Sequence, residues 1–532
     1  MSSLSASREG VKSVRSECGS RGSVPAAPRA PGRVSLHAPA ADPRYDRSCV
    51  RGCLRDHTDL FPRCAAARDA GPPPPPDRRL LSILPGRAIY RAPRSQAMTS
   101  VDDRPILFVS EYYPPFAPGG AEWTNAAWAA ALVRRGHRVV VVTPNYGSAP
   151  RQSSEAGVDV VRVPFWFKLA GARDEAGWRA HRHPMWTLYF AIWIARVAYS
   201  KDARVIHAQT KRSLVAAWLA ARVLRRPVLA TIRDLGLACP LGSCALIEPW
   251  TTFDCSTAQY VRKCIPFQLD HYHRRAGRAR RARLWVSSLI AWLGHVGRRG
   301  ALGRLDGVVA VSRGILEVYP SRRVPVRRSV VYTLPPTAGM PSIEDVRRVR
   351  LELSIGDGPL VLYVGKRSLG KGTAVLLAAL DTIRAAVPGV RFAFAGKGDL
   401  ELPSRDDIHA VGVLPHQQLF PLYGAADIVV SPSVWPEPLS RVLIEAMHFG
   451  RPVVATAVGG SPEAVEDRVT GLLVPKRDPE ALAAAIITLL RDPARRERMG
   501  AAARVRLASV FSEDKIITWL LDAYAAVNPR PV

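Results

Sequence analysis

From residue 105 onward, short and wholly apolar runs alternate with alanine-rich helical stretches. The first unit comprises ILFVS at 106–110, a proline- and glycine-rich loop, a helix that ends at Gly136, and HRVVVVTP at 137–144. Strands without polar alternation are buried on both faces, and a strand followed by a helix and a second strand requires a parallel sheet. The pattern therefore predicts a doubly wound α/β fold.

The same alternation occurs twice, on either side of the linker TLPPTAGMPS. The sequence therefore predicts two doubly wound α/β domains, at about 98–335 and 340–510. Ligands of such sheets bind beyond the carboxyl ends of the strands, so two facing domains are expected to enclose a cleft. Residues 511–532 contain a last helix with Ser512 as its N-cap, and we expect it to pack back on the first domain.

Residues 1–97 differ from the rest of the chain. They hold 13 of the 45 prolines and 17 basic residues, of which only Lys12 is a lysine, without a sustained helical or strand period. Such a composition buries too little apolar surface to offset the entropy of ordering, so we expect disorder. Two hypotheses stay open: translation begins at Met98, where the regular pattern starts, or the segment is a genuine Arg/Pro-rich tail.

A proline-flanked glutamate follows the predicted strand ADIVVSPS. The segment VWPEP ends that strand because its two prolines lack N–H groups, and a helix is predicted from Leu439 to Gly450. The free N–H groups at the helix start, together with its dipole, form an anion site. Glu437 and Glu445 lie beside it as acceptors for hydroxyl groups, which suits a nucleoside diphosphate sugar. The alternative is that both glutamates are surface charges.

The segment PEPLSRVLIEAMHFGRPVVATAVGGSPEAVEDRVTGLLVP at 436–475 resembles the donor-binding region of the retaining GT-B glycosyltransferases of the large GT4 group. The resemblance extends over about 104–525. It implies two Rossmann-like domains, the second of which binds the nucleotide sugar, and sugar transfer with retention of configuration. By this likeness Glu437 faces the hydroxyls of the donor sugar and Glu445 the ribose. The neighbouring donor-binding residues would be Pro438, Leu439 and Ser440.

Two further segments resemble phosphate-binding loops of that family. YVGKRSLGKGTAVLLAAL matches the basic pair that clamps the diphosphate, which implies this role for Lys366 and Lys371. Two cations stabilise a departing diphosphate in a water-excluded cleft. Lysine lacks the bidentate fork of the arginine usual at 366, so Arg367 is a candidate to share the role. PPFAPGGAEW matches the glycine loop, in which Gly119 and Gly120 let the backbone approach the phosphates.

The first domain departs from the family pattern. In TIRDLGLACP, Arg233 stands where a histidine is usual. A guanidinium is no base at neutral pH, but it binds an anionic acceptor or a phosphate. His207 ends the predicted strand RVIHAQT and is expected to face the cleft, with a structural role as the alternative. The acceptor-side candidates are therefore His207, Arg233 and Asp234, and the catalytic set is Glu437, Lys371, Lys366 and Arg233.

The sequence contains no Asp-x-Asp triplet, the carboxylate pair that holds a divalent ion in many transferases. We therefore expect a metal-independent reaction with no required cofactor and a nucleotide sugar as donor. A cysteine cluster at 239–264 leaves two interpretations open. Four thiolates would close a structural zinc site, whereas the absence of paired C-x-x-C spacing favours buried thiols. The four residues are Cys239, Cys244, Cys255 and Cys264.

The chain carries 75 Lys and Arg against 45 Asp and Glu, and this net charge of +30 favours anionic partners. Residues 262–304, within a Cys-rich and basic insertion expected at about 235–304, hold eleven of these cations and one acid, Asp270. Their central stretch LWVSSLIAWLGHV is too short to span a bilayer. It has an apolar helical face comprising Trp285, Leu289, Trp292, Leu293 and Val296.

Arginines flank this apolar face on both sides, as is typical of a helix that lies on an anionic membrane surface. Two other interpretations stay open: an insertion beside the acceptor site, and a core helix between solvated arginines. We expect a cytoplasmic protein that is peripheral on the inner face of the plasma membrane.

The sequence thus favours a retaining hexosyltransferase that acts on a lipid-linked, polysaccharide or other glycan acceptor. One alternative is a nucleotide-sugar epimerase on a similar fold. A basic nucleic-acid-binding protein is an alternative from another class, prompted by the charge. It is weakened because the sequence shows neither an RNA-binding motif nor regularly spaced stacking aromatics.

Overall fold

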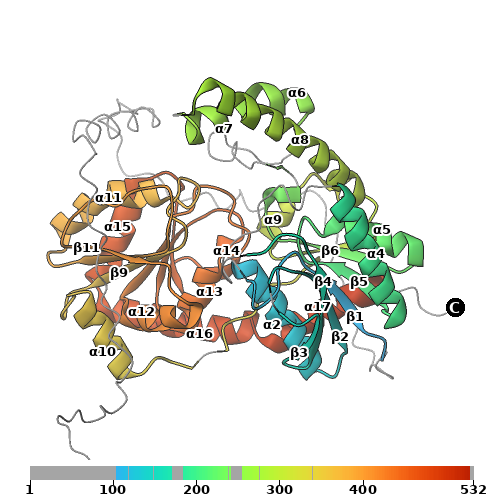
Figure 1. Ribbon diagram of the computed structural model, residues 1–532. Coiled ribbons are helices and arrows are strands. Elements are labelled where there is room, and N and C mark those ends of the chain that lie inside the picture. Colours follow the sequence, from blue (N-terminus) through green and yellow to red (C-terminus); the bar gives the residue numbers. More distant parts are fainter. Residues whose placement is uncertain are drawn as a thin grey trace, which may run out of the picture. The chain divides into compact units, whose positions relative to one another are not determined.

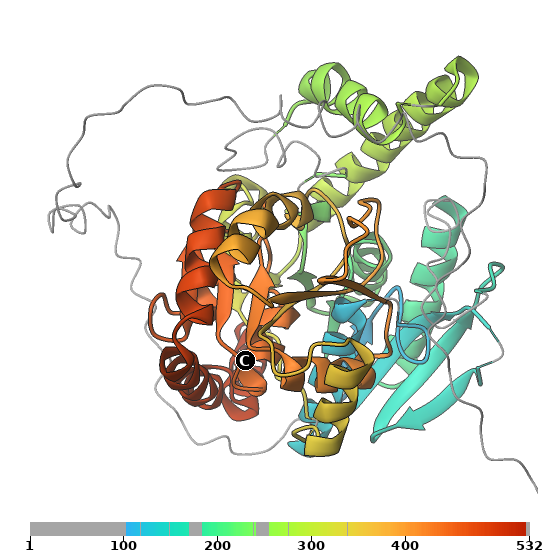
Figure 2. The ribbon, with the colours of Figure 1, turned by 90° about the vertical axis from the view of Figure 1, so that its left-hand side faces the viewer.

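The fold is that of a computed structural model (Figures 1 and 2). The described residues belong to one compact unit, Gln96–Val532, and comprise 103–527 apart from 118, 148, 170–183, 238, 241–254, 275 and 338. The predicted tail of 1–97, the hypothesis of a start at Met98 and any role of Cys244 lie outside the described residues.

Eight strands form the first sheet, in the order β3-β4-β2-β1-β5-β6-β7-β8, with only β3 antiparallel to its neighbour among the strands described. The strands predicted from apolar runs are all present. β3 and β8 were not predicted, because QSSE is polar and RSV is short and partly exposed. The bounds are β1 (Ile106–Val109), β2 (Val139–Asn145), β3 (Gln152–Glu155), β4 (Val158–Pro164), β5 (Val205–Ala208), β6 (Val228–Ile232), β7 (Gly307–Ala310) and β8 (Arg328–Val330).

Helices connect the parallel strands of this sheet, as the alternating pattern predicts. α2 and the C-terminal helix α17 pack together near β2, β7 and β8, while α4 and α5 pack on each other near β5 and β6 (Figure 1). The four helices are α2 (Gly120–Arg134), α4 (Pro184–Ser200), α5 (Leu214–Leu224) and α17 (Glu513–Val527).

The second sheet has six parallel strands in the order β11-β10-β9-β12-β13-β14. Strands β12 and β13 are completely buried and β9 is buried except at its last residue, as expected for a sheet covered on both faces. The predicted pair of doubly wound α/β domains is confirmed. The strands are β9 (Leu360–Val364), β10 (Arg391–Ala395), β11 (Ile408–Gly412), β12 (Ile428–Ser431), β13 (Val453–Thr456) and β14 (Gly471–Val474), and the main helices are α11 (Thr373–Ala386), α13 (Arg441–His448) and α15 (Pro479–Leu490).

The C-terminal helix returns to the first domain. α16 (Pro493–Val510) packs on α13 of the second domain, and α17 then packs on α2, β7 and β8 of the first (Figure 1). Arg134 forms an ion pair with Glu513 at 2.5 Å. Where α16 gives way to α17, the centroid of the Phe511 ring lies 5.0 Å from that of Tyr332, which directly precedes the interdomain linker. The predicted return of the last helix is therefore confirmed.

Glu463 joins the two domains. Its carboxylate accepts the backbone N–H groups of Arg313 at 2.9 Å and Gly314 at 2.7 Å. These amides open α9 (Arg313–Glu317) of the first domain. The Tyr332 hydroxyl donates to the same carboxylate at 3.0 Å. A side chain of one domain thus caps a helix of the other.

Replacing Glu463 by alanine is expected to lower the free energy of unfolding by about 1–2 kcal/mol, because two capping hydrogen bonds are lost. Denaturant unfolding of both variants measures the effect. Glu480→Ala is the matched control, since Glu480 is an exposed first-turn acid of α15 in the second domain. A loss no larger than that of the control would show that the cap contributes nothing.

The basic insertion forms a helical arm of α6 (Thr257–Gln259), α7 (Ile265–Tyr272) and α8 (Arg278–Leu302) (Figures 1 and 2). The predicted apolar face of α8 included Trp292. This residue is buried instead, because its ring stacks on that of Tyr260 with the centroids 4.5 Å apart. The exposed apolar residues of α8 are Trp285, Val286, Ile290, Leu293 and Val296. Among the described helices, none is both long and apolar enough to cross a membrane.

Candidate functional site

A cavity of about 280 Å³ lies where the carboxyl ends of the two sheets meet. The first domain contributes the start of α2 and residues that follow β6, β7 and β8. The second domain contributes residues that follow β9 and β12 and the start of α13. The expected cleft between the domains is therefore present.

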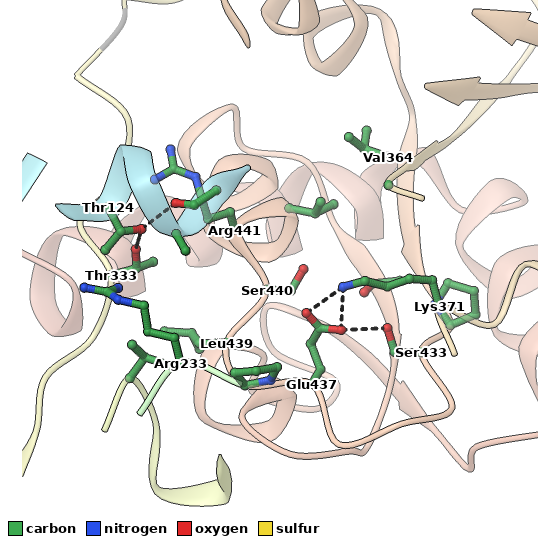
Figure 3. A pocket seen from close by; sticks show the side chains of 18 of the residues that line it. Thr124, Arg233, Thr333, Val364, Lys371, Ser433, Glu437, Leu439, Ser440 and Arg441 are labelled. Carbon is green, nitrogen blue, oxygen red and sulfur yellow. Dashed lines mark hydrogen bonds and ion pairs between the residues drawn. The ribbon is translucent and has the colours of Figure 1, made fainter. Parts of the chain in front are cut away.

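A partly buried ion pair lies in the wall of this cavity (Figure 3). The Lys371 ammonium nitrogen is 2.8 Å from both carboxylate oxygens of Glu437. Ser433 and Trp435 donate to the same carboxylate at 3.1 and 3.0 Å. Glu437 is only 5% exposed, so its charge is compensated by the protein rather than by water.

Burial alone would raise the pKa of Glu437, but the Lys371 ammonium and the hydrogen bonds from Trp435 and Ser433 outweigh burial and lower it. The carboxylate is therefore ionised at neutral pH. An ionised acid and a cation, both at a cavity, offer an acceptor for hydroxyl groups and a partner for an anion.

The helix after Glu437 begins at Arg441, two residues later than predicted. Ser440 keeps an extended backbone and serves as N-cap, and Pro438, Leu439 and Ser440 line the cavity before the helix starts. The glycine predicted to end this helix, Gly450, has the left-handed φ of +63° and follows the C-cap.

Glu445 is 4% exposed and does not line the cavity. Its carboxylate accepts from the Tyr423 hydroxyl at 2.8 Å and from Nε of Arg441 at 3.3 Å. Arg441, which the sequence did not single out, does line the cavity. The two glutamates therefore each hold a cation whose side chain reaches the cavity wall.

The predicted basic pair is divided. Lys371 lines the cavity, whereas the side chain of Lys366 is 62% exposed and forms an ion pair with Asp399 at 3.2 Å. The two residues before Lys366, Val364 and Gly365, line the cavity in its place. The sequence thus predicted correctly that the loop after β9 reaches the cavity, but it did not predict the direction of the Lys366 side chain.

The predicted glycine loop contributes one of its two glycines to the cavity wall. Gly120 lines the cavity, and a Cβ there would lie 2.8 Å from Cδ of Arg441, so the absence of a side chain lets the two domains approach. The N–H of Gly119 instead donates to the Glu122 carboxylate at 3.0 Å. Further along the wall, the hydroxyls of Thr124 and Thr333 are 2.8 Å apart (Figure 3), and neither was predicted as a site residue.

Arg233 lines the cavity from the first domain. Its guanidinium lies 4.5 Å from the ring centroid of Trp128 and donates to the side-chain oxygen of Gln209 at 2.8 Å. Asp234 does not line the cavity. Its side chain is 52% exposed and pairs with Lys211 at 3.0 Å.

The expectation that His207 faces the cleft is wrong. The ring is completely buried, because the C-terminal helix covers it. Its Nδ1 lies 2.8 Å from the Tyr524 hydroxyl and 3.0 Å from Nε2 of Gln209, and its Nε2 lies 2.8 Å from the Thr231 hydroxyl. The alternative, a structural role, is the one that the contacts support.

The stability of the protein is expected to depend on pH through His207. Burial and the nearby charge of Arg233 lower the pKa of His207 to about 3. An unfolded histidine titrates near 6.5, so between these values only the unfolded chain binds the proton. The contribution of neutral His207 to the free energy of unfolding is therefore fully present above pH 6.5. Below this pH it decreases by about 1.4 kcal/mol per pH unit.

Urea unfolding of the wild type and of His207→Gln at pH 7, 6 and 5 tests this expectation. The difference in unfolding free energy between the two proteins should shrink as the pH is lowered, because the variant lacks the group. Parallel pH curves would contradict it.

The structure describes three of the four clustered cysteines. Cys239, Cys255 and Cys264 are buried, and Cys244 lies outside the described residues. No three His, Cys, Asp or Glu side chains among the residues described are grouped so that they could hold a metal ion. The zinc hypothesis that needs all four thiolates thus stays open.

Known families match both domains. Residues 118–334 match the family described as "Glycosyltransferase Family 4", and residues 358–492 match the family described as "Glycosyl transferases group 1". Glycogen synthase of Mycobacterium tuberculosis is 36% identical over 177 residues, which are 32% of this chain and 42% of the relative. A D-inositol 3-phosphate glycosyltransferase of Segniliparus rotundus is 38% identical over 196 residues, 34% of this chain and 43% of the relative. The match thus spans less than half the length of these relatives.

Solved structures share the fold over most of the chain. Sucrose-phosphate synthase from Thermosynechococcus elongatus is 22% identical, with a TM-score of 0.57 over 79% of this chain and 98% of its own. Anabaena HepE in complex with UDP-glucose is 19% identical, with a TM-score of 0.54 over 79% and 99%. At these identities the likeness concerns the architecture alone.

Proposed function

The chain belongs to the group 1 glycosyltransferases of family 4, which have the GT-B fold, and on this basis we propose that it transfers a sugar from a nucleoside diphosphate sugar to a glycan acceptor. The observation that carries the proposal is the ion pair of the buried Glu437 with the half-buried Lys371 in the wall of the interdomain cavity. The HepE structure contains UDP-glucose, and that protein shares this architecture.

The donor would occupy the second-domain wall. Lys371 would contact the diphosphate and stabilise the charge that develops as it departs. Glu437, released in part from Lys371, would accept hydroxyl groups of the sugar. Pro438, Leu439, Ser440 and the backbone of Gly120 would complete the donor site, with Gly119 next to Gly120.

Two of the predicted donor-binding residues could contact the donor only after exchanging their present ion-pair partners. Lys366 would have to leave Asp399 to reach the diphosphate, and Glu445 would have to share its carboxylate between Arg441 and the ribose. Both roles therefore depend on a rearrangement when the donor binds.

The reaction we propose retains configuration and needs no metal ion. The leaving diphosphate oxygen takes the proton of the acceptor hydroxyl as the new glycosidic bond forms on the same face. This scheme is the one that the family resemblance implies, and the missing Asp-x-Asp triplet agrees with it. Arg233 cannot act as a base at neutral pH, which also suits a scheme without a protein base.

Thermal unfolding in the presence of a panel of nucleotide sugars tests the donor site. A ligand at 100 times its Kd is expected to stabilise the protein by about 2.7 kcal/mol by mass action. The product of incubation with the stabilising donor alone, analysed by chromatography, then separates transfer from epimerisation. A protein that no nucleotide or nucleotide sugar stabilises would refute the proposal.

We further propose that the acceptor is lipid-linked and that α8 rests on an anionic membrane surface. The exposed residues Val286, Ile290, Leu293 and Val296 follow helical spacing. Exposed arginines precede them at the start of the helix, namely Arg278, Arg280 and Arg283. An apolar stripe next to arginines suits the boundary between anionic head groups and acyl chains. We propose that this surface is the cytoplasmic face of the membrane.

Sedimentation with vesicles tests the membrane surface. The wild type should sediment with phosphatidylglycerol vesicles and far less with phosphatidylcholine vesicles. Ile290→Asp combined with Leu293→Asp should weaken binding at least tenfold. Val505→Asp is the control, since Val505 is an exposed apolar residue of another helix, α16. Equal sedimentation of wild type and double variant would exclude α8 as the contact.

A further inference from the structure

Arg233 differs from the other cations of the cavity wall. Lys371 is paired with Glu437 and Arg441 with Glu445, whereas no carboxylate within the described part of the chain lies at ion-pair distance from Arg233. Figure 3 shows its guanidinium on the first-domain side of the cavity, turned away from Lys371 and Glu437. A cation that is partly removed from water without a counterion is costly, unless a ligand supplies the negative charge.

The protein holds this guanidinium firmly in place. Nε of Arg233 donates to the Gln209 carbonyl at 3.3 Å, and one terminal nitrogen donates to the Gln209 side-chain oxygen. The Trp128 ring lies against it and is itself fixed by a hydrogen bond to the Tyr332 carbonyl at 3.2 Å. The remaining N–H groups of Arg233 have no protein acceptor among the residues described, and so are available to a ligand.

A buried network sets the orientation of Gln209. The Thr231 hydroxyl donates to the Gln209 oxygen at 3.1 Å, so it accepts the Nε2 proton of His207. The neutral His207 then accepts at Nδ1 from Tyr524 and from the Gln209 amide. This assignment leaves the oxygen of Gln209 facing Arg233. Tyr524 of the C-terminal helix thereby helps to position a residue of the cavity wall.

We propose that Arg233 binds an anionic group of the acceptor, a phosphate or a carboxylate, on the first-domain wall of the cavity. The inference rests on the proposed function, in which Lys371 and Glu437 of the second domain hold the donor. The planar guanidinium suits both anions, because two parallel N–H groups match two oxygens. A neutral sugar would supply no such charge, and the carboxylates of Glu122 and Asp234 act on the guanidinium only from beyond ion-pair distance.

Titration of the UDP-saturated protein with inorganic phosphate, and separately with acetate, at constant ionic strength tests the site and separates the two sources of charge. One of the two anions should bind the wild type, and Arg233→Gln should weaken that binding at least tenfold. Its affinity for UDP should stay within twofold. Arg222→Gln is the control, since Arg222 is an exposed arginine of α5 in the same domain, and it should behave as the wild type.

Three results would overturn the inference: neither anion binds the wild type, the anion binds Arg233→Gln as well as the wild type, or the variant loses UDP affinity tenfold. The last result would place Arg233 on the donor phosphates. Should Arg233→Gln fail to fold, Arg233→Lys keeps the charge without the fork, and an affinity equal to wild type would count against a bidentate site. If the wild type does not bind UDP, the titration uses the nucleoside diphosphate that does stabilise it. Failure to bind any nucleotide would refute the proposed function, and the anion titration is then carried out on the nucleotide-free protein.

Discussion

Replacing Glu437 by glutamine is expected to lower the kcat of sugar transfer about 100- to 1,000-fold. The neutral amide removes the charge that both carboxylate oxygens present to Lys371 at 2.8 Å, and it offers one acceptor oxygen to the donor hydroxyls instead of two. Losses of this size are typical when one preorganised polar group is removed from a site where charge develops. Release of the nucleoside diphosphate under saturating donor measures the effect.

Glu480→Gln is the matched control for this substitution, because it changes an exposed glutamate of the same domain outside the cavity. Its kcat should equal that of the wild type. A kcat of Glu437→Gln within threefold of the wild type would show that the carboxylate takes no part in the reaction.

Replacing Lys371 by methionine is expected to lower kcat by a similar factor and also to destabilise the fold by about 3 kcal/mol at neutral pH. Methionine keeps an unbranched side chain that is one heavy atom shorter, but the diphosphate loses a cation and Glu437 is left as a buried carboxylate without its partner. Transfer rates and denaturant unfolding measure the two effects. A variant with wild-type stability would show that the ion pair contributes nothing to the fold.

The dependence of stability on pH should reverse in this variant. In the wild type the pKa of Glu437 lies below its unfolded value, so its contribution is present above the unfolded pKa and is lost as the pH falls through the folded pKa. Without Lys371, burial raises this pKa. Stability is then lost as the pH rises through it. The double variant Lys371→Met with Glu437→Gln should lose less stability than Lys371→Met alone, because no unpaired charge remains.

The strands of both sheets could be predicted from apolar runs such as HRVVVVTP and RPVVATA. A strand that is buried on both faces consists almost entirely of apolar residues, and such a run is visible in the sequence. β3 could not, since it lies at the sheet edge where polar residues are tolerated. The cavity position of Glu437 and Lys371 was also foreseen, because both lie in loops at the carboxyl ends of strands.

The direction of individual side chains was beyond the sequence. Lys366 lies in the predicted loop, yet Asp399 holds it outside the cavity. His207 ends a strand as predicted, yet a helix that comes more than 300 residues later in the chain covers it. Glu445 is turned by Tyr423, which lies 22 residues earlier. In each case the residue that sets the direction of the side chain is distant in the chain. Local sequence patterns therefore could not predict the contact.

The chain passes between its domains at two places, through the linker that follows Tyr332 and through the junction at Phe511, and the centroids of these two rings lie 5.0 Å apart. Two crossings that touch act as one hinge. Rotation about it would leave Tyr332 and Phe511 almost still, while Gly120 and Arg441, which approach each other across the cavity, would move apart. We expect entry and release of ligands to follow this opening, and distances between spin labels on α2 and α13, measured with and without UDP, would record it.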